Sequence, residues 1–521
     1  MSPRLTRTDL AQTALIWLLT VTWDGQVYRF STRPIDVTDE DGEGIPFGGG
    51  LPDIDFEEDA GILDVSPELK TVAIEVVFPV DVALRIEGGH DLSAAEGELA
   101  YIRDGDALED RQIKLVGSVV EPEYGADGEP VRFSLEENAY DDTAITPAAG
   151  AVVSEATWPS STYTVPDASV GLYYPQVFGT PGVYVDATGA AATGRGSPAV
   201  VVHATGSTAN RVVVAGHRVT ATQVTIVDED ASTEVFSISQ IDDGLGRSVA
   251  TVDLTAAAVI DRTQELWVAW TNGKATIGVT GAGSLLRIML NLSSLRVDRG
   301  RIAALEPFLD RFDVSGYFDT AVVVWDWVQD NLLPILPVSM QSGPSGLFPV
   351  LWRYDALPAD SVADFIEGEN CTRASQVTYD RGPREVVNEI RATYALDGID
   401  GALRILAHTP GAEAGTVEQT TSRHSQISAA RYGTIALELE TDIVWTDRTM
   451  RLILAWMILS KALPTRLIEY QAGDDLTWPP TGSIVTLTSD DIHIDQIATL
   501  YRRSYTDTGL HSFVLLVQEQ L

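Results

Sequence analysis

Short segments in which apolar and polar residues alternate restrict the fold of this chain more than any other feature. They include Thr71–Phe78, continued after Pro79 by Val80–Ile86, and further on Arg111–Val120 and Val131–Leu135. Alternation with a period of two is typical of half-buried β-strands. Several short strands separated by turn residues predict a β-sandwich or a small β-barrel.

The first of these strands is predicted within the apolar run Leu10–Val21, which follows Arg4 and Arg7. A basic stub before an apolar run also fits a secretory signal, but no small-residue cleavage site follows. Instead the run continues into Asp24-Gly25, which predicts a two-residue hairpin turn because both positions need a positive φ. We therefore expect a folded strand. The run is too short to span a bilayer, and no other stretch reaches that length without charge, so no membrane-spanning segment is expected.

Residues 200–300 predict a second β-region. Arg211–Val214 and Val219–Val227 alternate well, and Asn272-Gly273 predicts a hairpin between Leu266–Trp270 and Ala275–Val279. The preceding segment, Ala144–Gly171, is rich in Ala, Pro, Ser and Thr, which favours a linker or an extended crossing segment.

After residue 305 the pattern changes to a mixture of helices and strands. The clearest helix is Thr446–Leu463, with Thr446 as its cap, Pro464 after its end and apolar residues around most of its circumference. Two more helices are predicted at Thr320–Leu333, which Pro334 would end, and at Ser361–Glu367. The predicted strands are Glu385–Tyr394, Arg466–Tyr470, Ile484–Thr488, Ile492–Tyr505 and Leu510–Gln518, the last two joined around Asp507-Thr508-Gly509.

The predicted fold class is therefore β-dominated and multidomain, with barrel or sandwich domains and an α+β C-terminal half. We expect a β-barrel domain over residues 1–150, a linker with a sandwich-like domain over 151–305, and α+β domains over 306–521.

The 521 residues include 35 basic and 75 acidic side chains, a net charge of −40. This charge argues against a protein that wraps nucleic acid or binds anionic membranes, since both need a basic surface. The segment Asp36–Asp64 holds eleven of the acids and no base, which predicts a solvated loop. Within it Asp39–Gly44 lacks the ligand spacing of a calcium loop.

A search for chemistry finds no motif. No G-x-S-x-G is present, Gly343–Gly346 reads as a turn, and neither Gly273-Lys274 nor Asp243–Gly246 completes a phosphate-binding loop. Cys371 is the only cysteine, which excludes an internal disulfide, and it is predicted to be a buried or half-buried thiol rather than a nucleophile. We therefore predict no catalytic, cofactor-binding or metal-binding residues and no cofactor. The seven histidines are scattered, without zinc spacing: His90, His203, His217, His408, His424, His493 and His511.

The tryptophan pairs leave a binding alternative open. Trp267 and Trp270, in a predicted hairpin, and Trp325 and Trp327, in a predicted helix, are interpreted as core residues, although they could form sugar platforms.

Three stretches of the chain follow one another in an order that is shared with a known family. They are the Trp23-Asp24-Gly25 hairpin with Ile113–Val119 and Val131–Ser134, then Tyr174–Gly179, then Gly346–Pro349, Asn388–Tyr394, the long helix and Gly482–Thr488. In this order they resemble the tail-tip or baseplate hub proteins of tailed bacteriophages. Ser483 stands after Gly482 where the family has an aspartate. Residues 183–305 match no part of that family and are interpreted as an inserted domain.

The resemblance implies a structural, non-enzymatic protein of the virion tail tip, made in the host cytoplasm. It implies a homo-oligomeric ring, a trimer in most relatives, that joins the tail tube to the tip or fibres during assembly. The implied partners are the distal tail and tube proteins, the fibre or tip proteins and the tape-measure protein, and DNA would pass without specific binding during genome ejection. Two alternatives stay open: a receptor-binding adhesin that uses the tryptophans, and a carbohydrate-active enzyme that uses carboxylates without a recognisable motif.

The charge of −40 has two interpretations under this resemblance. An acidic channel wall, including carboxylates between Asp104 and Asp142, would keep DNA from sticking to a ring. Alternatively, the acids are spread over the outside and maintain solubility.

Overall fold

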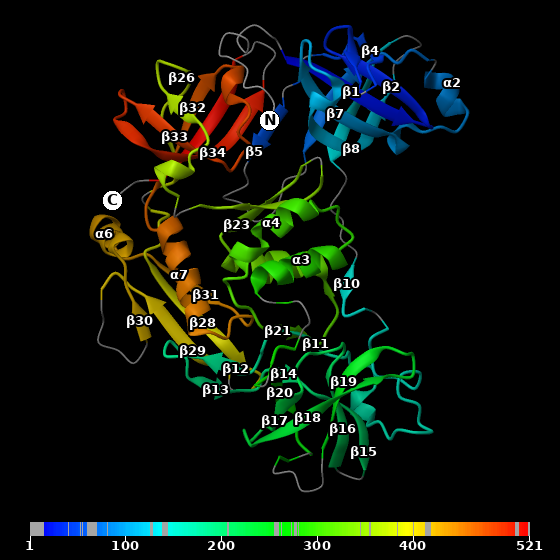
Figure 1. Cartoon of the computed structure of the whole chain (residues 1–521), viewed down its shortest axis with the longest axis vertical. Coiled ribbons are helices and arrows are strands. Elements are labelled where there is room, and N and C mark those ends of the chain that lie inside the picture. Colours follow the sequence, from blue (N-terminus) through cyan, green and yellow to red (C-terminus); the bar gives the residue numbers. More distant parts are fainter. Residues whose placement is uncertain are drawn as a thin grey trace.

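The chain is described by a computed structural model. It describes residues 15–518 apart from positions 40, 53, 55, 60–69, 81, 125–128, 138–143, 149, 206–207, 255–259, 262, 272, 276–278, 280, 344, 354–355, 383, 400, 412–417 and 506–509. Figure 1 shows an elongated molecule. Two strand-rich lobes, one from each end of the chain, lie at the top, helices occupy the middle, and a third strand-rich lobe forms the bottom.

The N-terminal lobe is an eight-stranded sheet with the order β3-β4-β2-β1-β7-β8-β9-β6. The predicted first strand is confirmed as β1, which lies inside this sheet between β2 and β7. Asp24 and Gly25 form the predicted hairpin turn, with φ of 49° and 70°. The elements are β1 (Leu15–Trp23), β2 (Gln26–Ser31), β3 (Ile35–Thr38), β4 (Gly44–Gly49), β6 (Thr71–Val76), α2 (Val82–Glu87), η1 (Leu92–Ala94), β7 (Glu96–Arg103), η2 (Leu108–Asp110), β8 (Gln112–Glu123) and β9 (Val131–Glu137).

The next segment crosses from this lobe to the bottom of the molecule and packs there. Trp158 and Tyr174 are buried against valines of β15, β16 and β19 in the bottom lobe, so Ala144–Gly171 is a packed crossing segment and not a linker. The segment contains β10 (Ile145–Thr146) and η3 (Asp167–Ser169), and it is followed by β11 (Gln176–Phe178), β12 (Val183–Val185) and β13 (Ala191–Thr193).

The bottom lobe is a seven-stranded sheet with the order β14-β20-β17-β18-β19-β16-β15. The predicted Asn272-Gly273 hairpin is wrong, because β20 already has β14 on one edge and β17 on the other. Asn272 and residues 276–278 themselves lie outside the described residues. The strands are β14 (Ser197–Pro198), β15 (Val200–Thr205), β16 (Thr208–Ala215), β17 (Gln223–Val227), β18 (Thr233–Asp242), β19 (Ser248–Asp253) and β20 (Trp267–Ala269).

Two helices that the sequence did not predict, α3 (Ala282–Leu292) and α4 (Arg299–Leu309), lie in the middle of the molecule. The helical region therefore begins near residue 282 rather than 305. The helix predicted at Thr320–Leu333 begins only at Val324 and tightens into a 3₁₀ turn that contains Pro334. The elements here are β21 (Gly316–Phe318), β22 (Val322–Val323), α5 (Val324–Trp327), the π-helical turn η4 (Val328–Leu332), η5 (Leu333–Ile335), β23 (Val338–Gln341) and β24 (Phe348–Leu351).

The C-terminal part contains a four-stranded sheet, β30-β29-β28-β31, and the long helix α7 packs on its strand β28. The predicted helix is confirmed, with the Thr446 hydroxyl accepting a hydrogen bond from the Thr449 amide. The elements are β28 (Glu389–Asp397), β29 (Gly401–His408), β30 (Glu418–Thr420), α6 (Arg423–Tyr432), β31 (Ala436–Glu440) and α7 (Asp447–Lys461).

The last lobe, red in Figure 1, is an eight-stranded sheet that includes a strand from the N-terminal part of the chain. Its main path is β25-β33-β34-β35-β32-β26, with β27 on β32 and β5 (Phe56–Asp59) on β34. The remaining elements are η6 (Pro358–Asp360), β25 (Asp364–Ile366), β26 (Cys371–Arg373), β27 (Thr378–Arg381), β32 (Thr465–Ala472), η7 (Asp474–Leu476), β33 (Ile484–Ser489), β34 (Ile494–Tyr505) and β35 (His511–Gln518).

Three local predictions are wrong. Val80–Ile86 is not a strand, because residues 82–87 form α2, which ends at Gly88-Gly89. Ser361–Glu367 is not a helix, because β25 pairs with β33. The acidic segment Asp36–Asp64 is not only a loop, since it contains β4, β5 and most of β3. For β25 and β5 a partner strand distant in the sequence decided the conformation.

The predicted fold class, β-dominated with barrel-like sheets and an α+β C-terminal half, is confirmed. The division at residues 150 and 305 stays a prediction. The largest hydrophobic core combines Phe178 and Tyr184 with α3, α4, α5, β28 and α7. In the described residues no helix combines the length and apolar character needed to cross a membrane.

Candidate functional site

The predicted candidates do not come together in one site. Among the described residues no group of three or more His, Cys, Asp or Glu side chains could hold a metal ion. Cys371 is buried, and burial raises the pKa of its thiol to about 12, which leaves it unreactive. Asp39 Oδ1 accepts hydrogen bonds from the backbone amides of Asp41 and Glu43 and forms a turn between β3 and β4.

The histidines lie far apart and make structural contacts. His408 bonds to Thr420 and Ser422, and His217 contacts the backbone of Val177. His511 is fully buried, with Nε2 2.6 Å from Asp474 Oδ1. His493, predicted in a strand, lies in the turn before β34 with a φ of 53°.

The tryptophan pairs belong largely to the core, as interpreted. Trp270 is buried and its indole N–H donates to Ser197, and Trp325, a residue of α5, is buried in the largest hydrophobic core. Trp267 is half-buried and faces Gly398, where any Cβ would come within 2.4 Å of its ring. Neither pair offers two exposed ring faces for a sugar.

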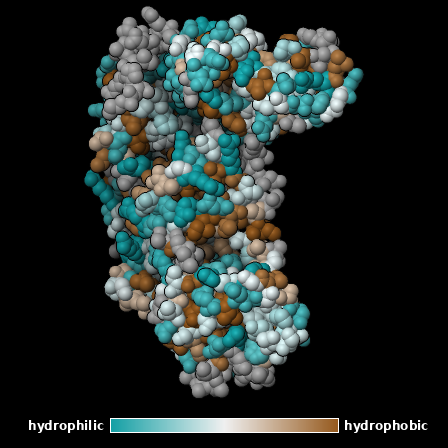
Figure 2. Space-filling model, turned by 45° about the vertical axis from the view of Figure 1, so that its right-hand side comes forward, coloured by the Kyte–Doolittle hydropathy of each residue, from teal (hydrophilic) through white to brown (hydrophobic). Residues whose placement is uncertain are grey.

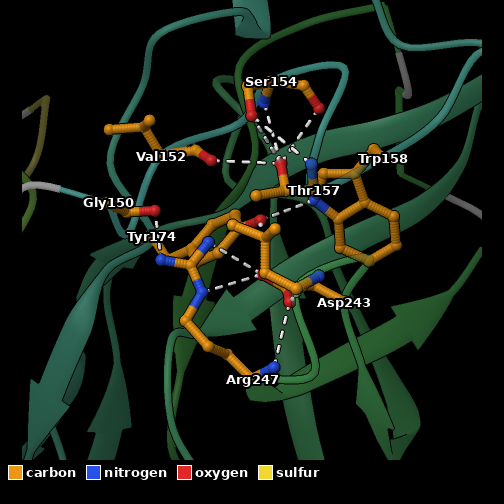
Figure 3. Close-up of polar contacts among 9 residues, drawn as sticks. Gly150, Val152, Ser154, Thr157, Trp158, Tyr174, Asp243 and Arg247 are labelled. Atoms are coloured by element: carbon orange, nitrogen blue, oxygen red, sulfur yellow. Dashed lines mark hydrogen bonds and ion pairs between the residues drawn. The ribbon is translucent and has the colours of Figure 1, made fainter.

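Figure 3 shows a polar cluster, here called the crossing joint, formed by Trp158, Tyr174, Asp243 and Arg247. The indole N–H of Trp158 donates to Tyr174 Oη at 2.8 Å, and Tyr174 lies 3.4 Å from Asp243 Oδ2. Arg247 donates to the same Asp243 oxygen at 2.8 and 3.0 Å. It also donates to the carbonyl oxygen of Gly150. Asp243-Gly244-Leu245-Gly246, which resembled part of a phosphate loop, is thus the β18–β19 turn that holds the crossing segment.

The polar groups of the crossing joint bond to one another and to nearby backbone atoms, as in a structural contact. Asp243 Oδ1 accepts the backbone amides of Leu245 and Arg247, at 2.9 and 3.0 Å. Gly244 lies so close to the crossing segment that a Cβ there would come within 2.3 Å of the Ala156 carbonyl oxygen. Burial raises the pKa of Tyr174, so its hydroxyl stays protonated and available as a hydrogen-bond donor.

A second cluster, here called the β5 joint, connects the two upper lobes through Glu58, Lys114, Arg503 and Tyr505. Strand β5 leaves the N-terminal lobe and pairs with β34, which places Glu58 opposite Arg503 in the register. Lys114 Nζ, from β8, donates to Glu58 Oε1 at 2.9 Å and to Tyr505 Oη at 2.8 Å. Arg503 donates to Glu58 Oε2 at 3.0 Å and to the Pro479 carbonyl at 2.7 Å. The exposed fractions are only 14% for Glu58, 9% for Lys114 and 5% for Arg503.

Burial and charge act against each other in the β5 joint. Burial alone would raise the pKa of Glu58, but Arg503, Lys114 and Lys70 together hold it well below its usual range. Burial lowers the pKa of Lys114 to about 8, although Glu58 favours its charged form. Tyr505 also packs into the N-terminal core, 6.1 Å from the ring of Trp17. Each charge in the joint therefore needs the others, because a buried charge without its partner is costly. The joint connects Glu58 and Lys114, near the start of the chain, to Arg503, which is 445 residues after Glu58.

A cavity of about 570 Å³ opens beside the β5 joint. Its lining comes from the N-terminal lobe, from the α4 to β24 region and from the C-terminal lobe. No sequence motif indicates this cavity, because its lining residues are distributed from Glu58 to Arg503 without local spacing.

No family model and no curated protein matches this chain. Among solved structures, a tail protein from Neisseria meningitidis is similar with a TM-score of 0.38 and 10% identity, over 97% of each chain. A 43 kDa tail protein of a Shewanella oneidensis prophage has a TM-score of 0.31 and 9% identity, over 96% of this chain and 98% of that one. A Listeria monocytogenes prophage tail protein has a TM-score of 0.32 and 8% identity, over 98% and 95%.

Proposed function

We propose that this chain is a structural tail-tip protein of a tailed bacteriophage, which forms a ring between the tail tube and the tip or fibres. The β5 joint carries the proposal. The ordered motifs that resemble hub proteins lie at both ends of the chain, and the β5 joint fastens those ends together through a shared strand and a buried charge cluster.

A fastened pair of barrel-like sheets suits a ring subunit. A closed ring needs the same surface geometry in every copy, and rigid lobes repeat that geometry better than lobes on a flexible linker. The trimeric state, the tail-tube, tape-measure and fibre partners, and the tail-tip location are parts of this proposal.

The passage of DNA is also part of the proposal. The N-terminal lobe exposes carboxylates in and around the range predicted for a channel wall, among them Glu109, Asp110, Glu121 and Glu123. Like charges on the wall would repel DNA over about a Debye length, near 8 Å at physiological salt. A ring whose lumen is neutral or basic would contradict this part and leave solubility as the reason for the charge.

The adhesin alternative has lost the observation on which it depended. It needed exposed tryptophans in residues 200–300, but Trp270 is buried and Trp267 is half-buried against Gly398.

The test is the mass of the purified chain together with its position in particles. We expect three copies in solution, and more complete assembly as the salt concentration rises, because chains with a charge of −40 repel each other less when screened. We also expect labelled antibodies against the chain to decorate one end of phage tails in negative-stain images. A single-copy mass at every salt concentration, with no label on the tail, would contradict the proposal.

A further inference from the structure

We propose that the cavity beside the β5 joint is a binding site for the phosphate group of a small molecule. This proposal is independent of a role in a tail.

The first observation is charge. Five basic and three acidic residues line the cavity, an excess of two positive charges, although acids outnumber bases 75 to 35 in the whole chain. Figure 2 shows hydrophilic residues interspersed with hydrophobic ones over one face of the molecule. A basic enclosure within such an acidic chain concentrates anions.

The second observation is a pair of N–H donors without partners. Gln341 Nε2 and Arg103 Nε are buried, and neither has a hydrogen-bond partner among the described residues. Both residues line the cavity, and Gln341 is 93% buried, since its exposed fraction is 7%. Buried donors are normally paired, so these two indicate an acceptor that belongs in the cavity.

The basic side chains that line the cavity differ in how strongly protein groups already bind them. Lys114 and Arg503 hold Glu58. Arg103 Nη2 makes only long contacts of 3.4 Å to the Asp474 carbonyl and to Thr477 Oγ1. Lys70 Nζ lies 3.4 Å from the Ser342 carbonyl. Arg103 and Lys70 are therefore the positive charges that an oxyanion would recruit.

A phosphate fits this set of donors best, because it accepts several N–H bonds at once and pairs with a guanidinium in bidentate geometry. The volume of about 570 Å³ is typical of small-molecule sites and leaves room for more than the phosphate itself. Trp478 also lines the cavity and is 61% exposed, so its ring is free to stack on a base. The phosphate could come from the free ion or from a nucleotide.

The experiment is a titration of the full-length chain with inorganic phosphate, followed by thermal unfolding, with sodium chloride added to keep the ionic strength constant. We expect a saturable rise in Tm. Arg103→Gln, Lys70→Gln and Gln341→Leu should each weaken the apparent affinity for phosphate about tenfold or more. Arg29→Gln, which removes an exposed charge from the same lobe, is the matched control and should bind like the wild type.

The outcomes decide whether the cavity binds phosphate, and whether that phosphate is the free ion or part of a nucleotide. No saturable rise beyond the chloride control, or binding by Lys70→Gln as tight as by Arg29→Gln, would overturn the proposal. Lys70 is only half-buried, so this variant decides the matter if Arg103→Gln does not fold. Equal affinity for phosphate and adenosine monophosphate would identify the free ion as the ligand. Tighter binding of the nucleotide that is lost in Trp478→Ala would identify a nucleotide.

Discussion

The β5 joint and the crossing joint both fasten distant parts of the chain, but they do so with different chemistry. The β5 joint is built on a carboxylate shared by Lys114 and Arg503, with all three groups largely buried. The crossing joint pairs Asp243 with an arginine that is about one-third exposed, and it adds the buried Trp158–Tyr174 contact. Because the Trp158 and Tyr174 rings would stay packed without a polar contact, we expect loss of the shared carboxylate to weaken the β5 joint more than loss of one hydroxyl weakens the crossing joint.

The largest expected effect is that of Glu58→Gln. It leaves Lys114 and Arg503 buried without their shared carboxylate, which should lower the free energy of unfolding by about 3–5 kcal/mol. Chemical denaturation at pH 7, followed by circular dichroism, measures the change. A loss below about 1 kcal/mol would mean that water or another acid compensates these cations, and that the contrast between the joints is wrong.

The same joint should respond to pH. Since the pKa of Glu58 is lowered in the folded chain, the folded state keeps this carboxylate at pH values where the unfolded chain has bound a proton. Its contribution is therefore present above the ordinary glutamate pKa of about 4.3 and decreases as the pH falls below that value. We expect the stability difference between the wild type and Glu58→Gln to be large at pH 7 and clearly smaller at pH 3. If the stability difference does not change with pH, the destabilisation by Glu58→Gln comes from altered side-chain packing and not from the lost charge.

In the crossing joint, Tyr174→Phe removes the hydroxyl that accepts the Trp158 indole N–H. The N–H is then buried without a partner, but both rings stay packed, so we expect a loss of about 1–3 kcal/mol. The thermal midpoint of the full chain measures it, with Tyr379→Phe at an exposed position as control. A loss as large as that of Glu58→Gln would show that the crossing joint depends on its polar contacts as strongly as the β5 joint does.

The smallest effect is expected from Glu57→Gln, one residue before Glu58 on β5. Glu57 pairs with Arg502 at 3.1 Å, but the two side chains are 51% and 39% exposed. Exposed ion pairs contribute about 0–1 kcal/mol, so the stability should barely change. Denaturation beside Glu58→Gln under the same conditions gives the comparison, and equal losses in both variants would assign the effect to the strand rather than to the buried charge.

Local sequence patterns predicted many elements correctly. The alternation in Thr71–Phe78 and Val131–Leu135, the Asp24-Gly25 turn and the cap at Thr446 each satisfy their requirements within a few residues. Predictions failed where the partner was distant. Asn272-Gly273 is a strong hairpin signal after the strand predicted at Leu266–Trp270, yet β14 and β17 occupy both edges of that strand.

The candidate site could not be predicted at all from local patterns. Glu58 lies in a segment whose eleven acids and lack of bases favour a solvated loop. Nothing near it in the sequence indicates Lys114, 56 residues away, or Arg503, 445 residues away. Gln341 and Arg103 likewise belong to no sequence motif. Each supplies a single donor, and only the tertiary structure brings the two donors to the same cavity.

The sequence by itself determined the strand-rich character, the positions of the strongest turns, the buried helix Asp447–Lys461 and the large negative charge. These depend on side-chain periodicity and composition, which are local properties. Only the tertiary structure decided which acids are buried, where β5 pairs, and that a basic cavity lies within an acidic chain. The reason is physical: the pKa and the stability contribution of a charge depend on what surrounds it in space, and that surrounding comes from residues the local pattern does not contain.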